Sequence, residues 1–137
     1  MLKVPERDPI PEPLATVLVV DDAATTRHLV TQTLEQLGFS TLSAADGYAA
    51  LEVARNFRPD AIVTDLEMPR MDGEALIEGL RNGEIEQLRD IPIIVCSSKI
   101  NPQTLGELSE LHVEAVVPKP VNVRTLAVAA LRYFNAV

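Results

Sequence analysis

The stretch TVLVV, Thr16–Val20, is a short apolar run that ends at the acidic pair Asp21-Asp22. Apolar residues at successive positions, rather than at alternate ones, predict a strand that is buried on both faces of a sheet. Further short apolar runs follow, and stretches with helical spacing separate them. The predicted strands are residues 16–20, 39–44, 61–64, 93–96 and 115–117, and the predicted helices lie around residues 30–37, 51–57, 75–88, 105–111 and 123–134. This alternation predicts an α/β fold with a mainly parallel sheet and helices on both faces.

The length of 137 residues suits one folded domain. We expect this domain to span residues 15–137. Residues 1–14 hold four of the ten prolines and no periodic apolar pattern, which predicts a disordered leader. The net charge of −8 and the absence of a basic cluster argue against direct binding of nucleic acid.

The sequence has no run of the roughly 18 apolar residues that a membrane span requires. Its N-terminus also lacks the apolar core of a signal peptide. The single cysteine, Cys96, excludes an internal disulfide and is predicted to be a buried, unreactive thiol. We therefore expect a cytoplasmic protein without membrane insertion.

Polar side chains follow the predicted strands at the ends where an open parallel sheet places its binding sites. Asp21 and Asp22 follow the first strand, Asp65 follows the third, Ser97 follows the fourth, and Lys119 comes shortly after the fifth. Each residue alone has a simpler explanation, since Asp and Ser commonly cap helices and a lysine is usually solvated. Together, three carboxylates, a hydroxyl and an ammonium group compose a chemical site at one edge of the sheet.

Three carboxylates at one edge raise one another's pKa unless a cation lies between them. Mg²⁺ suits this position, because it binds one or two carboxylates together with waters and phosphate oxygens. Lys119 and the hydroxyl of Ser97 can then contact other oxygens of a phosphoryl group. Asp65, on the central strand, is the predicted nucleophile, and the predicted product is an aspartyl phosphate.

Several segments resemble the receiver domain of bacterial two-component response regulators. The resemblance is to stand-alone receivers similar to chemotaxis regulators. The segments are VVDD (19–22), DLEMP with MDG (65–69 and 71–73), IVCSS (94–98) and PKP (118–120). The resemblance covers about residues 15–136. It implies a flavodoxin-like (βα)5 fold with five parallel strands in the order 2-1-3-4-5. It also implies a regulatory phosphoacceptor domain rather than an enzyme, which changes its contacts with other proteins when it is phosphorylated.

The resemblance implies a role for each acidic residue of the site. Asp65 would accept the phosphoryl group from a phosphohistidine of a partner histidine kinase. Asp22 and Asp65 would bind Mg²⁺ directly, and Asp21 would act mainly through water. The backbone carbonyl of Glu67 would be a further metal ligand.

The resemblance also assigns the switch residues. Ser97 would be the hydroxyl that moves toward the phosphoryl group, Lys119 would contact that group, and the bond before Pro120 would be cis. Receivers commonly have Tyr or Phe three residues before the lysine, where this chain has Val116. We hypothesise that the signal travels instead by displacement of the loop at residues 98–101. The downstream target is expected on the surface of the fourth helix, the fifth strand and the fifth helix.

Glu67 and Lys99 each lie two residues after a predicted site residue, so their side chains could meet at the mouth of the site. Such a pair could obstruct the water that hydrolyses an acyl phosphate, which predicts an effect of Lys99 on dephosphorylation. The alternative is that both are unrelated surface charges.

Other interpretations remain open. The chain could be a pseudo-receiver that acts as a protein-interaction module without phosphorylation, or a fragment of a hybrid histidine kinase. A phosphohydrolase of the haloacid-dehalogenase type would need Asp where Glu67 stands, and a flavin-binding protein would need a phosphate-binding loop where Asp21 and Asp22 stand. His28 and His112 are predicted to lie on solvated helix surfaces without a functional role.

Overall fold

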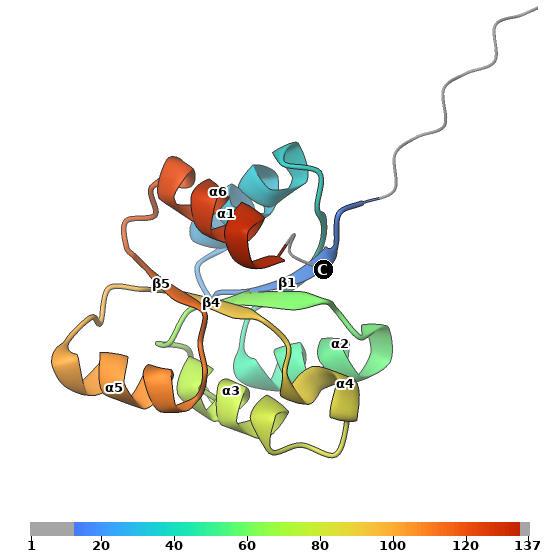
Figure 1. Cartoon of the computed structure of the whole chain (residues 1–137), viewed down its shortest axis with the longest axis vertical. Coiled ribbons are helices and arrows are strands. Elements are labelled where there is room, and N and C mark those ends of the chain that lie inside the picture. Colours follow the sequence, from blue (N-terminus) through green and yellow to red (C-terminus); the bar gives the residue numbers. More distant parts are fainter. Residues whose placement is uncertain (1–12, 135–137) are drawn as a thin grey trace, which may run out of the picture.

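The computed structural model describes residues 13–134, so the predicted leader lies outside the described residues except for Pro13 and Leu14. Neighbouring strands are parallel throughout, and their order is β2-β1-β3-β4-β5 (Figure 1). Both the predicted α/β fold and its strand order are confirmed. The strands are β1 (Thr16–Val20), β2 (Ser40–Ala44), β3 (Ala61–Thr64), β4 (Ile93–Ser97) and β5 (Ala115–Pro118).

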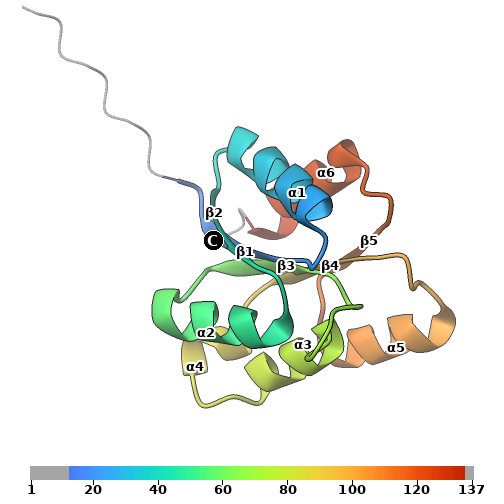
Figure 2. The ribbon, with the colours of Figure 1, turned by 180° about the vertical axis from the view of Figure 1, so that it is seen from behind.

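Helices cover both faces of the sheet. Figures 1 and 2 show α1 and α6 on one face and α2, α3, α4 and α5 on the other. No helix in the described part of the chain has the length and apolar character that crossing a bilayer requires. The helices are α1 (Ala24–Gln36), α2 (Gly47–Phe57), α3 (Gly73–Arg81), α4 (Glu86–Arg89), α5 (Pro102–Glu110) and α6 (Val123–Phe134).

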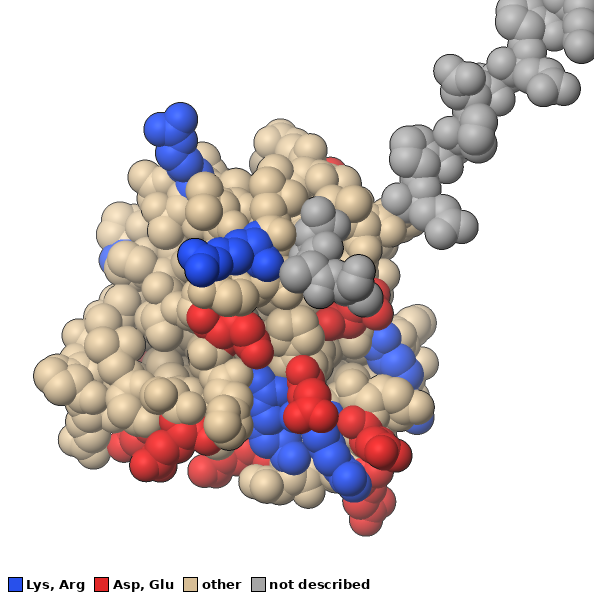
Figure 3. All heavy atoms as spheres, viewed as in Figure 1, with Lys and Arg blue, Asp and Glu red and all other residues tan. Residues whose placement is uncertain are grey.

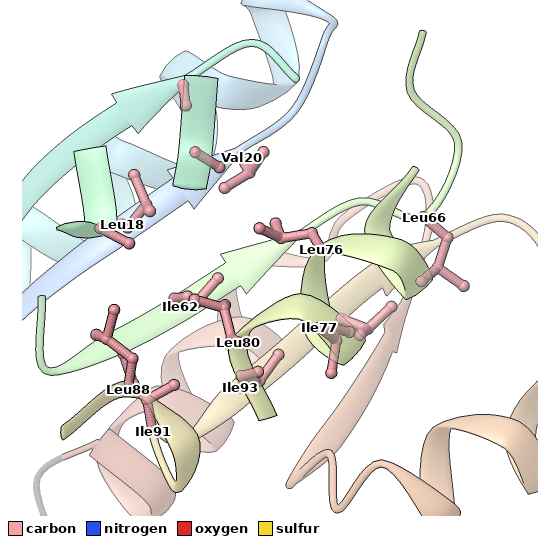
Figure 4. Packing of buried hydrophobic residues seen from close by; sticks show 14 of the residues in the cluster. Leu18, Val20, Ile62, Leu66, Leu76, Ile77, Leu80, Leu88, Ile91 and Ile93 are labelled. Atoms are coloured by element: carbon pink, nitrogen blue, oxygen red, sulfur yellow. The ribbon is translucent and has the colours of Figure 1, made fainter. Parts of the chain in front are cut away.

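The side chains of β1 alternate between two hydrophobic clusters. Leu18 and Val20 belong to the cluster between the sheet and helices α2 to α5, part of which is shown in Figure 4. Val17 and Val19 belong to the cluster beneath α1 and α6. All four are almost completely buried, which confirms a strand that is covered on both faces. Apolar burial of this kind is the main favourable term in folding and fixes the strand ends in space.

The prediction of a single helix over residues 75–88 is wrong, because α3 ends before Gly83 and the short helix α4 follows. A Cβ atom at Gly83 would lie 2.6 Å from the carbonyl oxygen of Gly79, so the chain turns at a point where only glycine fits. Leu88 of α4 enters the same cluster as Leu80 of α3. The helical spacing of apolar residues therefore continues across the break.

The strand boundaries agree with the sequence to within one residue, whereas α1, α2 and α5 begin three to six residues before the predicted ranges. β1 and β3 have their predicted bounds, and each of the other strands differs by one residue at one end. Asp46 and Gly47 form the beginning of α2. The Asp46 side chain caps this helix by accepting a hydrogen bond from the N–H of Ala49 at 2.9 Å.

Candidate functional site

Three carboxylates gather at the carboxyl edge of the sheet, where β1 and β3 end. One oxygen atom from each of Asp21, Asp22 and Asp65 lies within 4.8 Å of the other two. Asp21 and Asp65 are buried, and Asp22 is exposed. β1 and β3 are neighbours in the sheet, so their ends bring together the acidic residues that the sequence singled out.

Lys119 reaches this cluster from the segment after β5. Its Nζ lies 2.8 Å from Oδ2 of Asp21 and 3.0 Å from Oδ2 of Asp65. Its backbone N–H donates to the carbonyl oxygen of Ser97 at 3.0 Å, and its peptide bond to Pro120 is cis. Burial disfavours the charged ammonium group, but the hydrogen bonds and negative charges of Asp21 and Asp65 together outweigh this effect and raise the pKa of Lys119. Lys119 is therefore cationic at neutral pH.

The carboxylate of Asp65 is held from two sides. Oδ1 accepts a hydrogen bond from the N–H of Leu66 at 2.7 Å and a longer one from Glu67 at 3.4 Å, while Oδ2 faces Lys119. Gly73 packs against the backbone of the same residue, and a Cβ atom there would lie 2.1 Å from the carbonyl oxygen of Asp65. The segment between Asp65 and Gly73 is thus folded back tightly on the backbone of Asp65 and Leu66.

Both side-chain oxygens of Asp21 have hydrogen-bond donors. Oδ1 accepts from the N–H of Ala23 at 2.9 Å, and Oδ2 accepts from Lys119. Arg27 of α1 donates to the backbone carbonyl oxygen of Asp21 at 2.7 Å. The sequence interpretation did not include Arg27. The available signal was its place in the first turns of a helix that begins just after the acidic pair.

The donor set of this cluster fits a divalent cation such as Mg²⁺. All the available donors are oxygen atoms, which this hard ion prefers. Because Lys119 already faces Oδ2 of both buried carboxylates, the exposed carboxylate of Asp22 is the group most open to an incoming ion. The backbone carbonyl of Glu67 remains a predicted ligand.

A hollow of about 570 Å³ opens beside the acidic cluster. Glu67 and Lys99 both line it, as expected for residues at the mouth of the site. Within residues 13–134, however, the ion pairs within 4.0 Å do not include one between Glu67 and Lys99. The complete lining is Asp22, Leu66, Glu67, Met68, Pro69, Asp72, Glu74 and Lys99.

The two switch positions lie on neighbouring strands. Ser97 is completely buried at the end of β4, and its Oγ accepts a hydrogen bond from the N–H of Lys99 at 2.9 Å. Val116 lies on β5 opposite Val95 and packs against the cluster that contains Leu108 of α5. Its side chain therefore contributes to packing beside α5, and it offers no ring that could reorient.

Cys96 and the two histidines lie outside the acidic cluster. Cys96 is buried in β4, and burial raises the pKa of its thiol to about 12, which confirms the predicted buried cysteine. His28 lies in α1, as expected. His112 does not lie in a helix, because it follows α5 in a left-handed conformation with φ of 58°.

Comparison with known proteins agrees with this geometry. The response regulator receiver domain family matches residues 17–131. The Regulator of RpoS of Escherichia coli (strain K12) is 37% identical over 105 residues, which cover 77% of this chain and 30% of that protein. Chemotaxis protein CheY-3 of Vibrio cholerae is 32% identical over 111 residues, which cover 80% of this chain and 84% of that protein. The chain thus spans less than a third of the first relative and most of the second.

Solved structures show the same arrangement. The chemotaxis response regulator CheY4 of Vibrio cholerae superposes with a TM-score of 0.79 at 32% identity, over 86% of this chain and 97% of that one. The matched residues 17–131 include nearly all of the five-stranded sheet, the three carboxylates and Lys119. From this agreement of sequence, fold and site, the chain belongs to the response regulator receiver domain family of two-component signalling.

Proposed function

We propose that Asp65 accepts a phosphoryl group from a phosphohistidine of a partner histidine kinase, in a reaction that depends on Mg²⁺. The main support is the position of Lys119, whose Nζ lies 3.0 Å from Oδ2 of Asp65 beside the three-carboxylate cluster. Receiver domains as a family are regulatory phosphoacceptors. This chain has the acceptor, the acidic pair and the lysine together at one edge of its sheet.

The transfer exchanges one bond to phosphorus for another. A carboxylate oxygen of Asp65 attacks the phosphorus atom and forms an acyl phosphate. The bond from phosphorus to the imidazole nitrogen breaks, and the nitrogen keeps the electron pair. Lys119 remains cationic and neutralises charge on a phosphoryl oxygen, which is the kind of fixed electrostatic support that speeds such transfers.

The metal would be held directly by Asp22, Asp65 and the backbone carbonyl of Glu67, with Asp21 acting through water. Its chemistry is to neutralise charge between these carboxylates and the phosphoryl oxygens. The N–H of Leu66 keeps the Asp65 carboxylate oriented through its 2.7 Å hydrogen bond to Oδ1. These groups are positioned before the donor arrives.

The response to phosphorylation would pass through Ser97 to the surface formed by α5, β5 and α6, where a protein target would bind. The hydroxyl of Ser97 would turn toward the phosphoryl group and weaken its bond to the N–H of Lys99. Figure 3 shows uncharged side chains over much of the α5 region with acidic side chains along its lower edge, and charged side chains of both signs near α4. Ile100 and Leu105 are 40% and 42% exposed there and offer apolar contact area.

The decisive experiment is incubation with acetyl phosphate, with and without Mg²⁺, followed by mass measurement of the intact protein. The parent should gain one phosphoryl group only when Mg²⁺ is present, and the matched variant Asp65→Asn should gain none. Binding of a beryllofluoride mimic should show the same dependence. Absence of modification in the parent, or equal modification of the variant, would contradict the proposal and favour a pseudo-receiver.

A further inference from the structure

The beginning of α2 contacts the far end of the segment that contains Asp65. We call residues 65–72 the acceptor loop. The N–H of Gly47 donates to the carbonyl oxygen of Met71 at 3.2 Å. A Cβ atom at Gly47 would lie 2.6 Å from Cγ of Met71, so no larger residue fits at this contact. The two elements therefore touch backbone to backbone, on the α2 side of the acidic cluster.

Arg70 adds two side-chain contacts between the same elements. Its guanidinium group forms an ion pair and a hydrogen bond with Oδ2 of Asp46. Its Cζ also lies 5.8 Å from the centre of the Tyr48 ring, within the range of a cation–π interaction. Three consecutive residues at the beginning of α2, residues 46–48, thus contact Arg70 and Met71 of the acceptor loop.

The conformation of Arg70 indicates that these contacts hold the loop in place. Its φ of 68° lies in the left-handed region, which is unfavourable for a residue with a side chain. A strained backbone persists where its surroundings determine it, and here the surroundings are the contacts with Asp46 and Tyr48. Removing the guanidinium group would release the loop from its side-chain contacts with Asp46 and Tyr48.

Asp46 uses its two oxygens for two separate purposes. Oδ1 accepts from the N–H of Ala49 and caps α2, while Oδ2 binds Arg70. The hydrogen bond from Ala49 and then the one from Arg70 lower the pKa of the Asp46 carboxyl. The Asp46 side chain is 11% exposed and that of Arg70 is 64% exposed, so the pair lies at the rim of the protein.

We propose that Arg70 is a positioning residue for Mg²⁺ binding, which it favours by tying the acceptor loop to the beginning of α2 through Asp46. This inference rests on the proposed function, in which the loop supplies the Asp65 carboxylate and the Glu67 carbonyl to the metal. A loop that is ordered before the ion binds loses less conformational freedom on binding. The Asp46–Arg70 pair provides that order without contacting the ion.

Simple electrostatics predicts that loss of the Arg70 charge changes the Mg²⁺ affinity in the opposite direction, which makes the proposal testable. A cation near a metal site repels Mg²⁺, so removal of its charge alone would strengthen Mg²⁺ binding. The positioning role predicts the reverse for Arg70→Gln. The direction of this one change in affinity therefore separates the two explanations.

The experiment is calorimetric titration of Mg²⁺ into the parent, Arg70→Gln, Asp46→Asn and the double variant. Asparagine keeps an oxygen that can cap α2, so Asp46→Asn removes the ion pair and preserves the cap. Each single change should weaken Mg²⁺ binding about two- to fivefold, within the range that a partly exposed ion pair supports. The double variant should be no weaker than the singles, because both remove the same contact. Unchanged or stronger binding by Arg70→Gln, or additive losses, would overturn the proposal.

Two further measurements separate positioning from general damage. Amide hydrogen exchange of residues 66–72 in metal-free protein should be faster in Arg70→Gln, and Arg70→Lys should restore part of the Mg²⁺ affinity. Modification of the parent by acetyl phosphate in the presence of Mg²⁺ is measured in parallel. If the parent binds Mg²⁺ but is never phosphorylated, the proposed phosphorylation is refuted. The Mg²⁺ affinities of the parent and the variants still decide the positioning role in that case. Unchanged exchange in Arg70→Gln would count against the positioning role itself.

Discussion

The ammonium group of Lys119 lies 2.8 Å from Oδ2 of Asp21, although the two residues are 98 positions apart in the sequence. The same group lies 3.0 Å from Asp65, so one cation compensates two buried carboxylates. An ammonium group in this position attracts the phosphoryl oxygens and repels a divalent cation. Its two effects on the proposed reaction therefore have opposite signs.

Replacement of Lys119 by methionine should make both effects visible. Without the ammonium charge, Mg²⁺ should bind about two- to fivefold more tightly, while modification by acetyl phosphate should become about 10- to 100-fold slower. Calorimetry and mass measurement check the two quantities. Lys99→Met is the matched control for Mg²⁺ binding, because Lys99 lines the hollow but forms no ion pair with Asp21 or Asp65. Weaker Mg²⁺ binding by Lys119→Met would show that the competition is absent.

Lys99 should influence the lifetime of the phosphorylated state. It lines the same hollow as Glu67, through which water would approach the acyl phosphate. Lys99→Ala should change the rate of dephosphorylation, measured by loss of radiolabel after removal of the donor, whereas Lys99→Arg should keep a rate near that of the parent. Equal rates for Lys99→Ala and the parent would refute a role at the mouth of the site.

Phosphorylation should loosen the segment after β4. Ser97 holds this segment through the hydrogen bond from the N–H of Lys99 to its Oγ. If the hydroxyl turns toward a phosphoryl group, amide exchange over residues 98–101 should become faster when beryllofluoride and Mg²⁺ are added. Ser97→Ala should abolish the difference. Identical exchange with and without beryllofluoride would show that this loop is not displaced. The signal would then not pass through the loop in place of the aromatic residue that receivers commonly have at the position of Val116.

Glu74 should reduce stability at neutral pH. Partial burial, followed by the neighbouring Glu107 carboxyl, raises its pKa above the ordinary value. A raised carboxyl pKa favours the protonated folded state, so stability declines as pH rises through the ordinary value of about 4.3 toward the raised one. Glu74→Gln should therefore increase the free energy of unfolding at pH 7 by about 0.5 kcal/mol or less, because solvent screens the site.

Urea denaturation at two pH values checks the effect of Glu74. The gain from Glu74→Gln should shrink or vanish at pH 4, where the carboxyl is protonated. Glu78→Gln, on the same helix, controls for the loss of one negative charge. A gain that is equally large at pH 4 would contradict the assigned cause.

Arg81 should be a major contributor to stability away from the site. Its guanidinium group donates to the carbonyl oxygens of Leu111, Arg89, Ile91 and His112, at 2.7 to 3.1 Å. A lysine ammonium cannot reach this spread of acceptors, so Arg81→Lys should lower the free energy of unfolding by about 1–2 kcal/mol. Urea denaturation measures the loss. Modification by acetyl phosphate should be unchanged, and a large drop in that rate would mean that Arg81 also affects the site.

Local patterns were sufficient to predict the sheet and the polar strand ends. Val17 to Val20 are buried on both faces, and that environment leaves a continuous apolar run in the sequence. Parallel strands place their carboxyl ends at one edge, so the sequence alone predicts that Asp21, Asp22 and Asp65 lie together. These features depend on neighbours in sequence and on one general property of parallel sheets.

Contacts between distant segments could not be predicted in the same way. The ion pair of Arg70 joins it to Asp46, 24 residues earlier, through a loop conformation that no periodic pattern specifies. The same limit applies to Glu67 and Lys99, which share a hollow without forming an ion pair.

The burial of Cys96 has a practical consequence for experiments in solution. It is the single cysteine of the chain, and its thiol is buried with a pKa of about 12, so almost no reactive thiolate is present at neutral pH. Reagents that alkylate thiolates should therefore leave the native protein unlabelled. A cysteine introduced on the surface of α5 would then be the only thiol that reacts with a spin label or a fluorophore. Cys96 would not have to be replaced first.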